Sequence, residues 1–352
     1  MLQQSAAREA NVSVLADAVG RKKRKLRRFA SWFLPIAAMI VAVAALFAFL
    51  ISEKIKSELA VPQRISVQLG SDALEHEVSR PINHLQSLAQ REKIVQDVVD
   101  AQRAADLTQM VSAFRSLLSR NPEYAQIRWI GDDGMERVRV ERAADGDSRV
   151  LPLSELQDKS DRYYVRNTLK QKAGEVFVSP LDLNVEHGRI ELPYHPMIRL
   201  GMRVFRRDGT PNGLFILNIS AHHMLDKFAV HALGANLLLL NADGYWLSSP
   251  SVDDEWGFML GKADTFGTRY PEIWTVISSI REGQRETDTG LWFWKRVTVT
   301  PEHAANVNPV EWMVVAHLSS SEMTRKLRDA WLPITLGATA LLVLLGLGIW
   351  RL

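Results

Sequence analysis

The chain has 352 residues, which is enough for two folded modules at the usual domain size of about 100–200 residues. Its net charge is only +3, so the charge of the whole chain indicates no nucleic acid or other polyanion as a partner. It contains no cysteine, which fits a bacterial extracytoplasmic domain that uses no disulfides.

The basic residues are concentrated in GRKKRKLRR, residues 20–28, directly before an uncharged apolar stretch. We interpret residues 1–31 as a basic cytoplasmic tail whose first 20 residues are mobile, and residues 32–51 as a membrane-spanning helix. Residues 331–350 have the same apolar character, with Trp331 and Trp350 at the two ends where interfacial aromatics are common. They predict a second span. Membrane lipid is therefore an expected partner.

The basic cluster before the first span predicts the orientation, because such clusters stay in the cytoplasm. Residues 52–330 are then periplasmic, and the chain crosses the inner membrane of a bacterium twice. Arg325, Lys326 and Arg328 flank the second span on the outer side and oppose this orientation. The first cluster is larger and the first helix usually dominates, so it decides the prediction.

Residues 52–120 show helical periodicity, with apolar residues at spacings of three and four: Leu74, Val78, Ile82, Leu85 and Leu88. Pro62 and Pro81 predict breaks in this long stalk helix. A second helix follows around Phe114. Both apolar stripes are expected to pack in a core.

From Tyr124 the pattern changes to strands. A strand, an Asp133-Gly134 turn and a second strand are predicted, and Asp243-Gly244 repeats this arrangement later in the chain. The repetition predicts two related α+β modules in tandem, at residues 121–227 and 228–318. The first module ends with a hairpin around Asp208-Gly209.

The second module is rich in tryptophan, which more often fills the core of a small domain than lines a ligand cage. Its last two strands are predicted at residues 291–300 and 311–318. Residues 319–330 are predicted to form a juxtamembrane helix that enters the second span. The predicted fold class is therefore α+β, with a long N-terminal stalk helix and two tandem modules between two transmembrane helices.

The chemistry of the chain lies around residues 178–219, a polar loop followed by the hairpin. The arginines near it could hold a carboxylate or phosphate through paired N–H groups; they are Arg128, Arg162, Arg166, Arg189 and Arg199. The alternative for each is an ordinary ion pair with Asp182, Glu186 or Glu191. His187, His195 and the His222-His223 pair lack the spacing of a metal site, and no catalytic motif is present. We predict no metal, no cofactor and no catalytic residue.

The order of the predicted elements resembles the double Cache sensors, also called PDC or tandem-PAS sensors, of bacterial transmembrane receptors. The strings YAQIRWIGDDGMERVRV, VFVSPLDLNVEHGRIELPYHPMIR, GLFILNI and LLLLNADGYWLSSPSVDDEWGFML carry this resemblance. They are most similar to the sensor halves of membrane histidine kinases and diguanylate cyclases. The resemblance implies two PAS-like modules, a homodimer and a ligand site in the membrane-distal module.

In the amino-acid-binding branch of that family, an arginine and aromatic residues hold the carboxylate of the ligand and acidic residues hold its amine. The resemblance places Arg162 at the carboxylate position and Tyr164 at an aromatic position, with Val165 in place of the next aromatic residue. Asp182 could oppose an amine, but Asn218 stands where the final aspartate is expected. We therefore expect a small anionic ligand rather than an ordinary amino acid. The predicted ligand-binding residues are Arg128, Arg162, Tyr164, Asp182, Asn184, Arg199 and Asn218.

Two classes of function follow. The first is a receptor that binds a small molecule outside the membrane and passes the change through the second span to a cytoplasmic kinase or cyclase. The second is an extracytoplasmic enzyme anchored at both ends. Leu352 follows closely after the second span, so we expect either the sensor part of a longer protein or a complete sensor that acts through a membrane partner.

Overall fold

A computed structural model describes residues 2–90, 107–143, 145–186, 188–206, 208–299 and 310–351. Two compact units are present: Pro62–Leu318 is one, and Met1–Val61 with Ser319–Leu352 is the other. The units are joined by α1 (Leu2–Ala89), and by α9 (Ser320–Arg351), which begins directly after the last strand.

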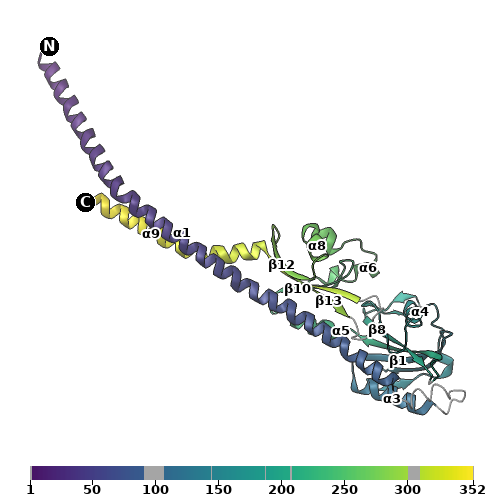
Figure 1. The fold of residues 1–352 in the computed structure, drawn as a ribbon. Helices are drawn as coiled ribbons and strands as arrows, with labels where there is room; N and C mark the ends of the chain where they lie inside the picture. Colours follow the sequence, from purple (N-terminus) through teal and green to yellow (C-terminus); the bar gives the residue numbers. More distant parts are fainter. Residues whose placement is uncertain are drawn as a thin grey trace. The chain divides into compact units, whose positions relative to one another are not determined.

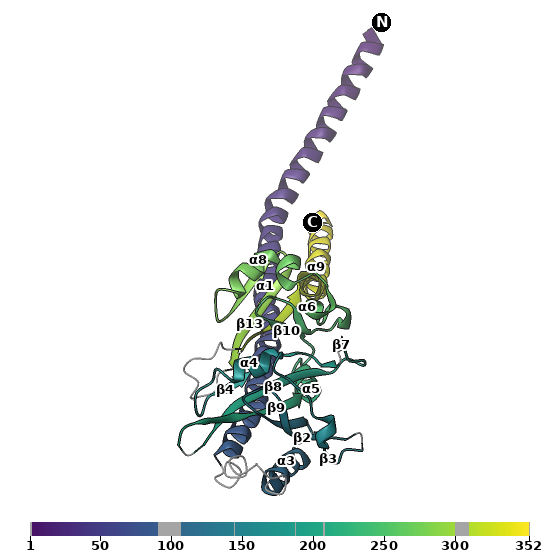
Figure 2. The same cartoon turned by 90° about the vertical axis from the view of Figure 1, so that its right-hand side faces the viewer.

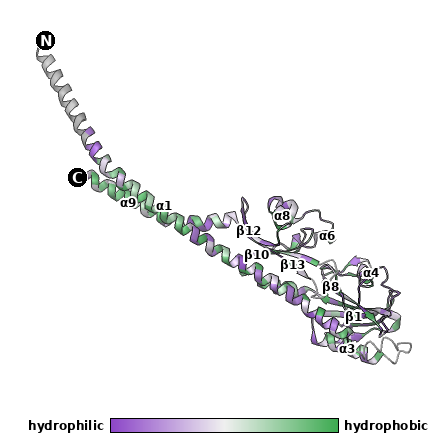
Figure 3. Cartoon of the chain, in the orientation of Figure 1, coloured by the Kyte–Doolittle hydropathy of each residue, from purple (hydrophilic) through white to green (hydrophobic). Residues whose placement is uncertain are grey.

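The unit that contains both chain termini consists of two helical segments. Trp331 on α9 donates a hydrogen bond from Nε1 to the Ser52 hydroxyl on α1, at 2.9 Å. At the other end, Phe29 and Trp350 meet edge to face with ring centroids 5.8 Å apart, so the segments run antiparallel. Within the described residues, α1 and α9 are the helices long and apolar enough to cross a membrane, and Figure 3 shows their apolar stretches.

The first helix differs from the prediction in two ways. It begins at Leu2, so the N-terminal tail is helical, and it continues through Pro62 and Pro81 without a break. A proline in a helix removes one backbone donor. The apolar stripe keeps its phase past Pro81, from Leu74 to Leu88, and these residues are buried; side-chain packing therefore holds the helix together there.

The first sheet has seven strands, in the order β3-β2-β1-β9-β8-β4, with β5 paired to β8. One face packs on α3 (Thr108–Arg120), where Phe114 meets Phe215 edge to face at 5.4 Å. The opposite face is covered in part by α4 (Tyr163–Thr168), as Figures 1 and 2 show. The strands are β1 (Tyr124–Ile130), β2 (Glu136–Arg142), β3 (Ser148–Val150), β4 (Val176–Val178), β5 (Asp182–Leu183), β8 (Pro196–Phe205) and β9 (Pro211–Ser220). A small hairpin, β6 (Val185–Glu186) with β7 (Arg189–Ile190), stands apart from it, and a 3-10 turn, η2, spans Leu153–Glu155.

The second sheet has five strands in the order β11-β10-β14-β13-β12. Its tryptophans fill the core, as predicted, and Trp246, Trp292, Trp294 and Trp312 are buried. The polar edge strand β12 was not predicted, because it lacks an apolar alternation. The strands are β10 (Asn236–Asn241), β11 (Trp246–Ser248), β12 (Glu282–Thr287), β13 (Gly290–Val299) and β14 (Val310–Ser319); the helices are α5 (His222–Val230), α6 (Gly257–Leu260), α7 (Phe266–Arg269) and α8 (Pro271–Ile277), with η3 at Val252–Asp254. The predicted end of the penultimate strand at Thr300 lies outside the described residues.

The two sheets share one strand order. Numbering the core strands of each along the chain gives 2-1-5-4-3 in both, from β1, β2, β4, β8 and β9 in the first and β10 to β14 in the second. In each sheet the turn between the first two strands is the predicted Asp-Gly turn, and Gly134 and Gly244 adopt the positive φ angles of 86° and 83° that it requires. The Asp208-Gly209 hairpin between β8 and β9 is also confirmed.

Candidate functional site

Strand register decides which residues share the α4-facing side of the first sheet. Gln126 on β1 lies opposite Asn218 on β9, and Asn218 lies opposite Arg199 on β8. Directly opposed residues point to the same side, so these three polar side chains form a row across the central strands. The next row on that side contains Arg128, Ile216 and Gly201.

One half of this face is apolar and fixes α4. Ile130, Leu214, Ile216 and Phe177 pack there with Tyr164 and Val165 of α4. Gly201 permits the close approach of the helix, since a Cβ atom at this position would lie 1.9 Å from Oγ1 of Thr168. Tyr164 is thereby held with its ring in the apolar half and its hydroxyl at the border of the polar half.

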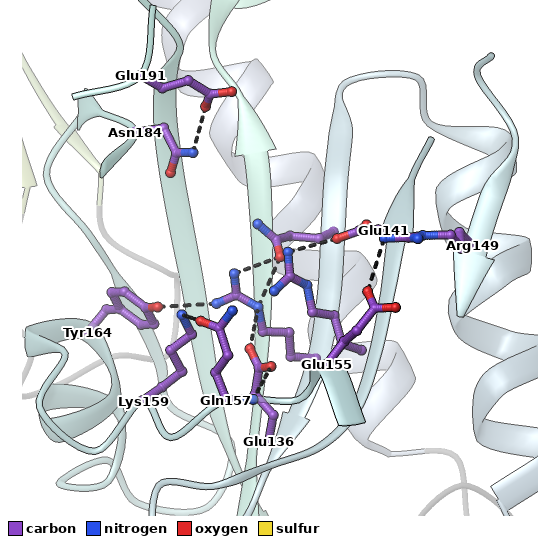
Figure 4. Close-up of polar contacts among 12 residues, drawn as sticks. Glu136, Glu141, Arg149, Glu155, Gln157, Lys159, Tyr164, Asn184 and Glu191 are labelled. Carbon is purple, nitrogen blue, oxygen red and sulfur yellow. Dashed lines mark hydrogen bonds and ion pairs between the residues drawn. The ribbon is translucent and has the colours of Figure 1, made fainter. Parts of the chain in front are cut away.

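Arg128 is the centre of the polar half. Its side chain is 4% exposed and lies 3.2 Å, Nε to Oε1, from Glu136, which is fully buried. Nη2 donates to Oε1 of Gln126 at 2.6 Å, and Nη1 donates to the Tyr164 hydroxyl at 3.1 Å. Oε2 of Glu136 accepts the backbone N–H of Gln157. Tyr164, Glu136 and Gln157 are labelled in Figure 4 and lie in the same part of the site.

Arg199 forms the second charged centre. Nη1 binds Oδ1 of Asp182, and Nη2 donates to Oδ1 of Asn184 at 3.2 Å. The Tyr163 hydroxyl donates to Oδ2 of Asp182 at 2.8 Å. Burial raises the pKa of Tyr163, and the Asp182 carboxylate raises it further, so this hydroxyl remains a donor at neutral pH. Burial opposes the charge on Arg199, but Asp182 and Tyr163 hold its pKa above its usual value.

The two centres are joined by the Tyr164 ring and bordered by a lysine. The guanidinium carbon of Arg199 lies 5.4 Å from the centroid of the Tyr164 ring, a cation–π distance. Lys159 is 6% exposed and donates to Oε1 of Gln157 at 2.6 Å, a contact visible in Figure 4. Asn184 also holds Oε2 of Glu191, beyond the β6–β7 hairpin, at 2.9 Å. The hairpin is thus tied to the same cluster as Arg199.

Asn218 lies in the middle of the cluster and is 1% exposed. Its Oδ1 is buried and has no hydrogen-bond partner in the part of the chain that the structure describes. A buried acceptor without a donor costs about 1–3 kcal/mol, so it is uncommon unless the site has another use.

The second sheet has leucines at the positions equivalent to Ile130 and Arg128, and a histidine at the position equivalent to Asn218. With the two Asp-Gly turns superposed, Leu240 takes the place of Ile130, Leu238 that of Arg128, and His317 that of Asn218. Leu238 and Leu240 belong to a core cluster with Trp246, Trp292 and Phe266. His317 stacks on Trp292, with ring centroids 3.7 Å apart.

The structure brings six of the seven predicted ligand-binding residues into or beside this cluster: Arg128, Tyr164, Asp182, Asn184, Arg199 and Asn218. The seventh, Arg162, is half-buried at the N-terminus of α4, and its side chain makes no hydrogen bond or ion pair with other described residues. Arg166 and Arg189 are exposed. The Asp182 pairing foreseen for the arginines exists for Arg199.

Sequence reasoning missed Gln126, Glu136, Lys159 and Tyr163. Gln126 and Arg128 alternate with buried Ile127 and Trp129 on β1, and this polar alternation on a strand otherwise expected to be buried was the available signal. Among the described residues, no group of three or more histidine, cysteine, aspartate or glutamate side chains is placed to hold a metal ion. The rings of His195 and His222 meet edge to face at 5.5 Å.

The chain thus has an α+β fold with two antiparallel sheets that follow a long N-terminal helix, and with apolar helices near both ends of the chain. The sequence family described as "Bacterial histidine kinase, sensor domain" matches residues 74–307, more than half of the chain. The chain belongs to this family, and the predicted resemblance to extracytoplasmic receptor sensors is confirmed. No curated protein matches it in sequence.

Solved structures with this fold come from several receptor types. The extracellular domain of vpHK1S-Z8, assigned to the histidine kinases, has 18% identity and a TM-score of 0.57, with 74% of this chain and 95% of that chain covered. A sensory box/GGDEF family domain from Vibrio parahaemolyticus has the same identity and TM-score, with 74% and 99% covered. The ligand-binding domain of the Campylobacter jejuni chemoreceptor Tlp3, in complex with L-valine, has 9% identity and a TM-score of 0.53, with 78% and 97% covered.

Proposed function

We propose that the chain is the sensory part of a transmembrane receptor that binds a small anionic molecule on the first sheet. One observation carries this proposal. The first sheet buries Arg128 where the second sheet has Leu238 of its apolar core, and Arg199 and Lys159 are buried near Arg128. Burying charged groups is costly even when they are paired, and clusters of buried titratable groups are a feature of ligand sites. An anion placed against these side chains would be held by charge-assisted hydrogen bonds.

In this proposal the two sheets are the two PAS-like modules of a double Cache sensor, with the first at residues 121–227 distal to the membrane and the second at residues 228–318 proximal to it. The shared strand order 2-1-5-4-3 and the repeated Asp-Gly turn support this assignment. The basic cluster at residues 20–28 favours the cytoplasm for the N-terminus, and so the periplasm for residues 52–330 of a protein in a bacterial inner membrane.

A path for the signal leaves the site through β5. Asp182 pairs with Arg199, and the next residue, Leu183, donates its backbone N–H to Sδ of Met259 on α6 at 3.0 Å. Met259 precedes the helices that cover the second sheet, whose strand β14 ends at Ser319, directly before α9. A ligand that binds two conformations of β5 with different affinity would shift the second sheet through this contact.

The expected output is a cytoplasmic histidine kinase or diguanylate cyclase, in the same polypeptide or on a membrane partner. A homodimer agrees with two exposed apolar residues one turn apart on α1, Ile65 and Leu69, which are 44% and 39% exposed. Chemical cross-linking of an Ile65→Cys variant in membranes tests it, because a parallel α1 pair brings the two cysteines together. Cross-linking of a variant with cysteine at buried Val67 serves as the matched control.

The receptor and the anchored enzyme are separated by one experiment. The full chain in lipid nanodiscs is screened for thermal stabilisation against a metabolite library, and each stabilising compound is then tested for chemical turnover by mass spectrometry. The receptor predicts stabilisation by a small anion without turnover. Turnover of the bound compound, or the absence of any stabilising compound, would contradict the proposal.

A further inference from the structure

We infer that the ligand is a carboxylate whose second polar group is a neutral hydrogen-bond donor, in the simplest case the hydroxyl of a hydroxy acid, and that Asn218 accepts from it. This inference rests on the proposed function and assigns a chemical class to the ligand. It starts from the buried Oδ1 of Asn218, a neutral acceptor in the site to which no described residue donates.

The negative charges of the carboxylates in the site are already compensated by arginines. Oδ1 of Asp182 receives Arg199, and Oδ2 receives the Tyr163 hydroxyl. Oε1 of Glu136 receives no hydrogen bond from described residues, but its charge is compensated by Nε of Arg128 at 3.2 Å, and Oε2 accepts the Gln157 backbone N–H. An ammonium group needs an ionised acceptor when it leaves water. At this site it would meet a neutral amide beside two guanidinium groups, whose charge repels it.

The donors for a carboxylate are available next to Asn218. Arg199 lies directly opposite Asn218 on the neighbouring strand, so the Cβ atoms of the pair are about 5 Å apart. A guanidinium has five N–H groups, and the two hydrogen bonds of Arg199 to described side chains use two of them. One small ligand can therefore give its carboxylate to Arg199 and its hydroxyl to Asn218.

Matched sets of three probes test this inference: lactate, alanine and propionate; malate, aspartate and succinate; 3-phenyllactate, phenylalanine and 3-phenylpropanoate. Each set keeps one carbon skeleton and carries a hydroxyl, an ammonium or a hydrogen at the same carbon. Binding to the full chain in nanodiscs is measured by calorimetry. In the set whose skeleton fits, the hydroxy acid should bind at least tenfold more tightly than both other members. The unsubstituted acid offers no donor to Oδ1 of Asn218, and the amino acid brings an ammonium group to a site without a free carboxylate.

Two substitutions at Asn218 separate the acceptor from the shape of the site. Asn218→Leu keeps the size and removes the acceptor, so the ratio of hydroxy acid to unsubstituted acid should fall to about one. Asn218→Asp supplies a carboxylate and should reverse the preference towards the amino acid. The melting temperature of each variant without ligand shows that it folds.

The outcomes distinguish this inference from the proposed function. An amino acid that binds most tightly to the wild-type protein, or a selectivity that Asn218→Leu leaves unchanged, overturns the ligand class only. Binding of a different class of metabolite that is lost in Arg199→Ala, with no binding of the nine probes, also overturns the class while the receptor function stands. If no compound of any class binds, both proposals fail.

Discussion

Arg128 on β1 and Glu136 on β2 form an ion pair that is closed off from solvent, with 3.2 Å between Nε and Oε1. Removing one partner of such a pair leaves a buried charge without compensation, which typically costs about 3–5 kcal/mol. Glu136→Ala should therefore lower the free energy of unfolding by about 3 kcal/mol, measured by thermal or denaturant unfolding of the full chain in detergent. Arg137→Ala, which breaks the exposed pair with Asp133, is the control and should cost less than about 1 kcal/mol. Equal effects of the two substitutions would contradict the structure.

Arg162 and Arg199 are expected to differ in what they contribute to the stability of the free protein. Arg162 has no side-chain partner among described residues, so Arg162→Ala should leave the melting temperature of the free protein unchanged. If Arg162 holds the ligand carboxylate, as the family resemblance implies, the same substitution should abolish the stabilisation by the ligand. Arg199→Ala should abolish that stabilisation too, but it should also destabilise the free protein, because it leaves Asp182 without its cation. Both are measured by thermal shift with and without a stabilising compound from the metabolite screen. Unchanged ligand affinity in Arg162→Ala would remove Arg162 from the site.

The contact between Leu183 and Met259 can be tested by hydrogen exchange. The Leu183 amide donates to a thioether sulfur, and Met259→Leu removes this acceptor while keeping the volume of the side chain. Loss of a hydrogen bond worth about 1 kcal/mol should make the Leu183 amide exchange about fivefold faster. Met224→Leu, a buried methionine of α5, is the control that should leave this amide unaffected. An unchanged exchange rate in Met259→Leu would show that the sulfur does not protect the amide.

Stability should fall in mild acid. Burial lowers the pKa of His317, and burial together with Arg80 lowers the pKa of His84. As pH falls, the two histidines are protonated in the unfolded chain before they are protonated in the folded protein. Their contribution to the free energy of unfolding is therefore complete above the unfolded pKa of about 6.5, and it is lost as pH falls through their folded pKa values. We expect a lower melting temperature at pH 5 than at pH 7.5, and a smaller difference in His317→Phe, which keeps the stack on Trp292. Arg269 lowers the pKa values of Asp254 and Asp264, so protonation of these two carboxylates reduces stability only below about pH 4. A transition confined to that lower range would contradict the role of His317.

The sequence alone determined the features that depend on local order along the chain. The two apolar helices, the Asp-Gly turns with their flanking strands, the α3 stripe with Phe114 and the tryptophan core of the second sheet could all be predicted, because composition and periodicity specify them. Pro62 and Pro81 were misleading, since a helix can lose single backbone hydrogen bonds when its buried face continues in phase.

The tertiary structure decided what the polar residues do. Gln126, Asn218 and Arg199 come from three strands, and only their register shows that they form one row on one side of the sheet. The sequence pointed to Arg128 and Arg199 as pocket residues. Pairing between strands sets Glu136 and Gln126 against Arg128, and the position of α4 brings Tyr163 to Asp182, the partner of Arg199. A buried acceptor such as Oδ1 of Asn218 is a property of everything packed around it, and so it can be recognised only once the chain has folded.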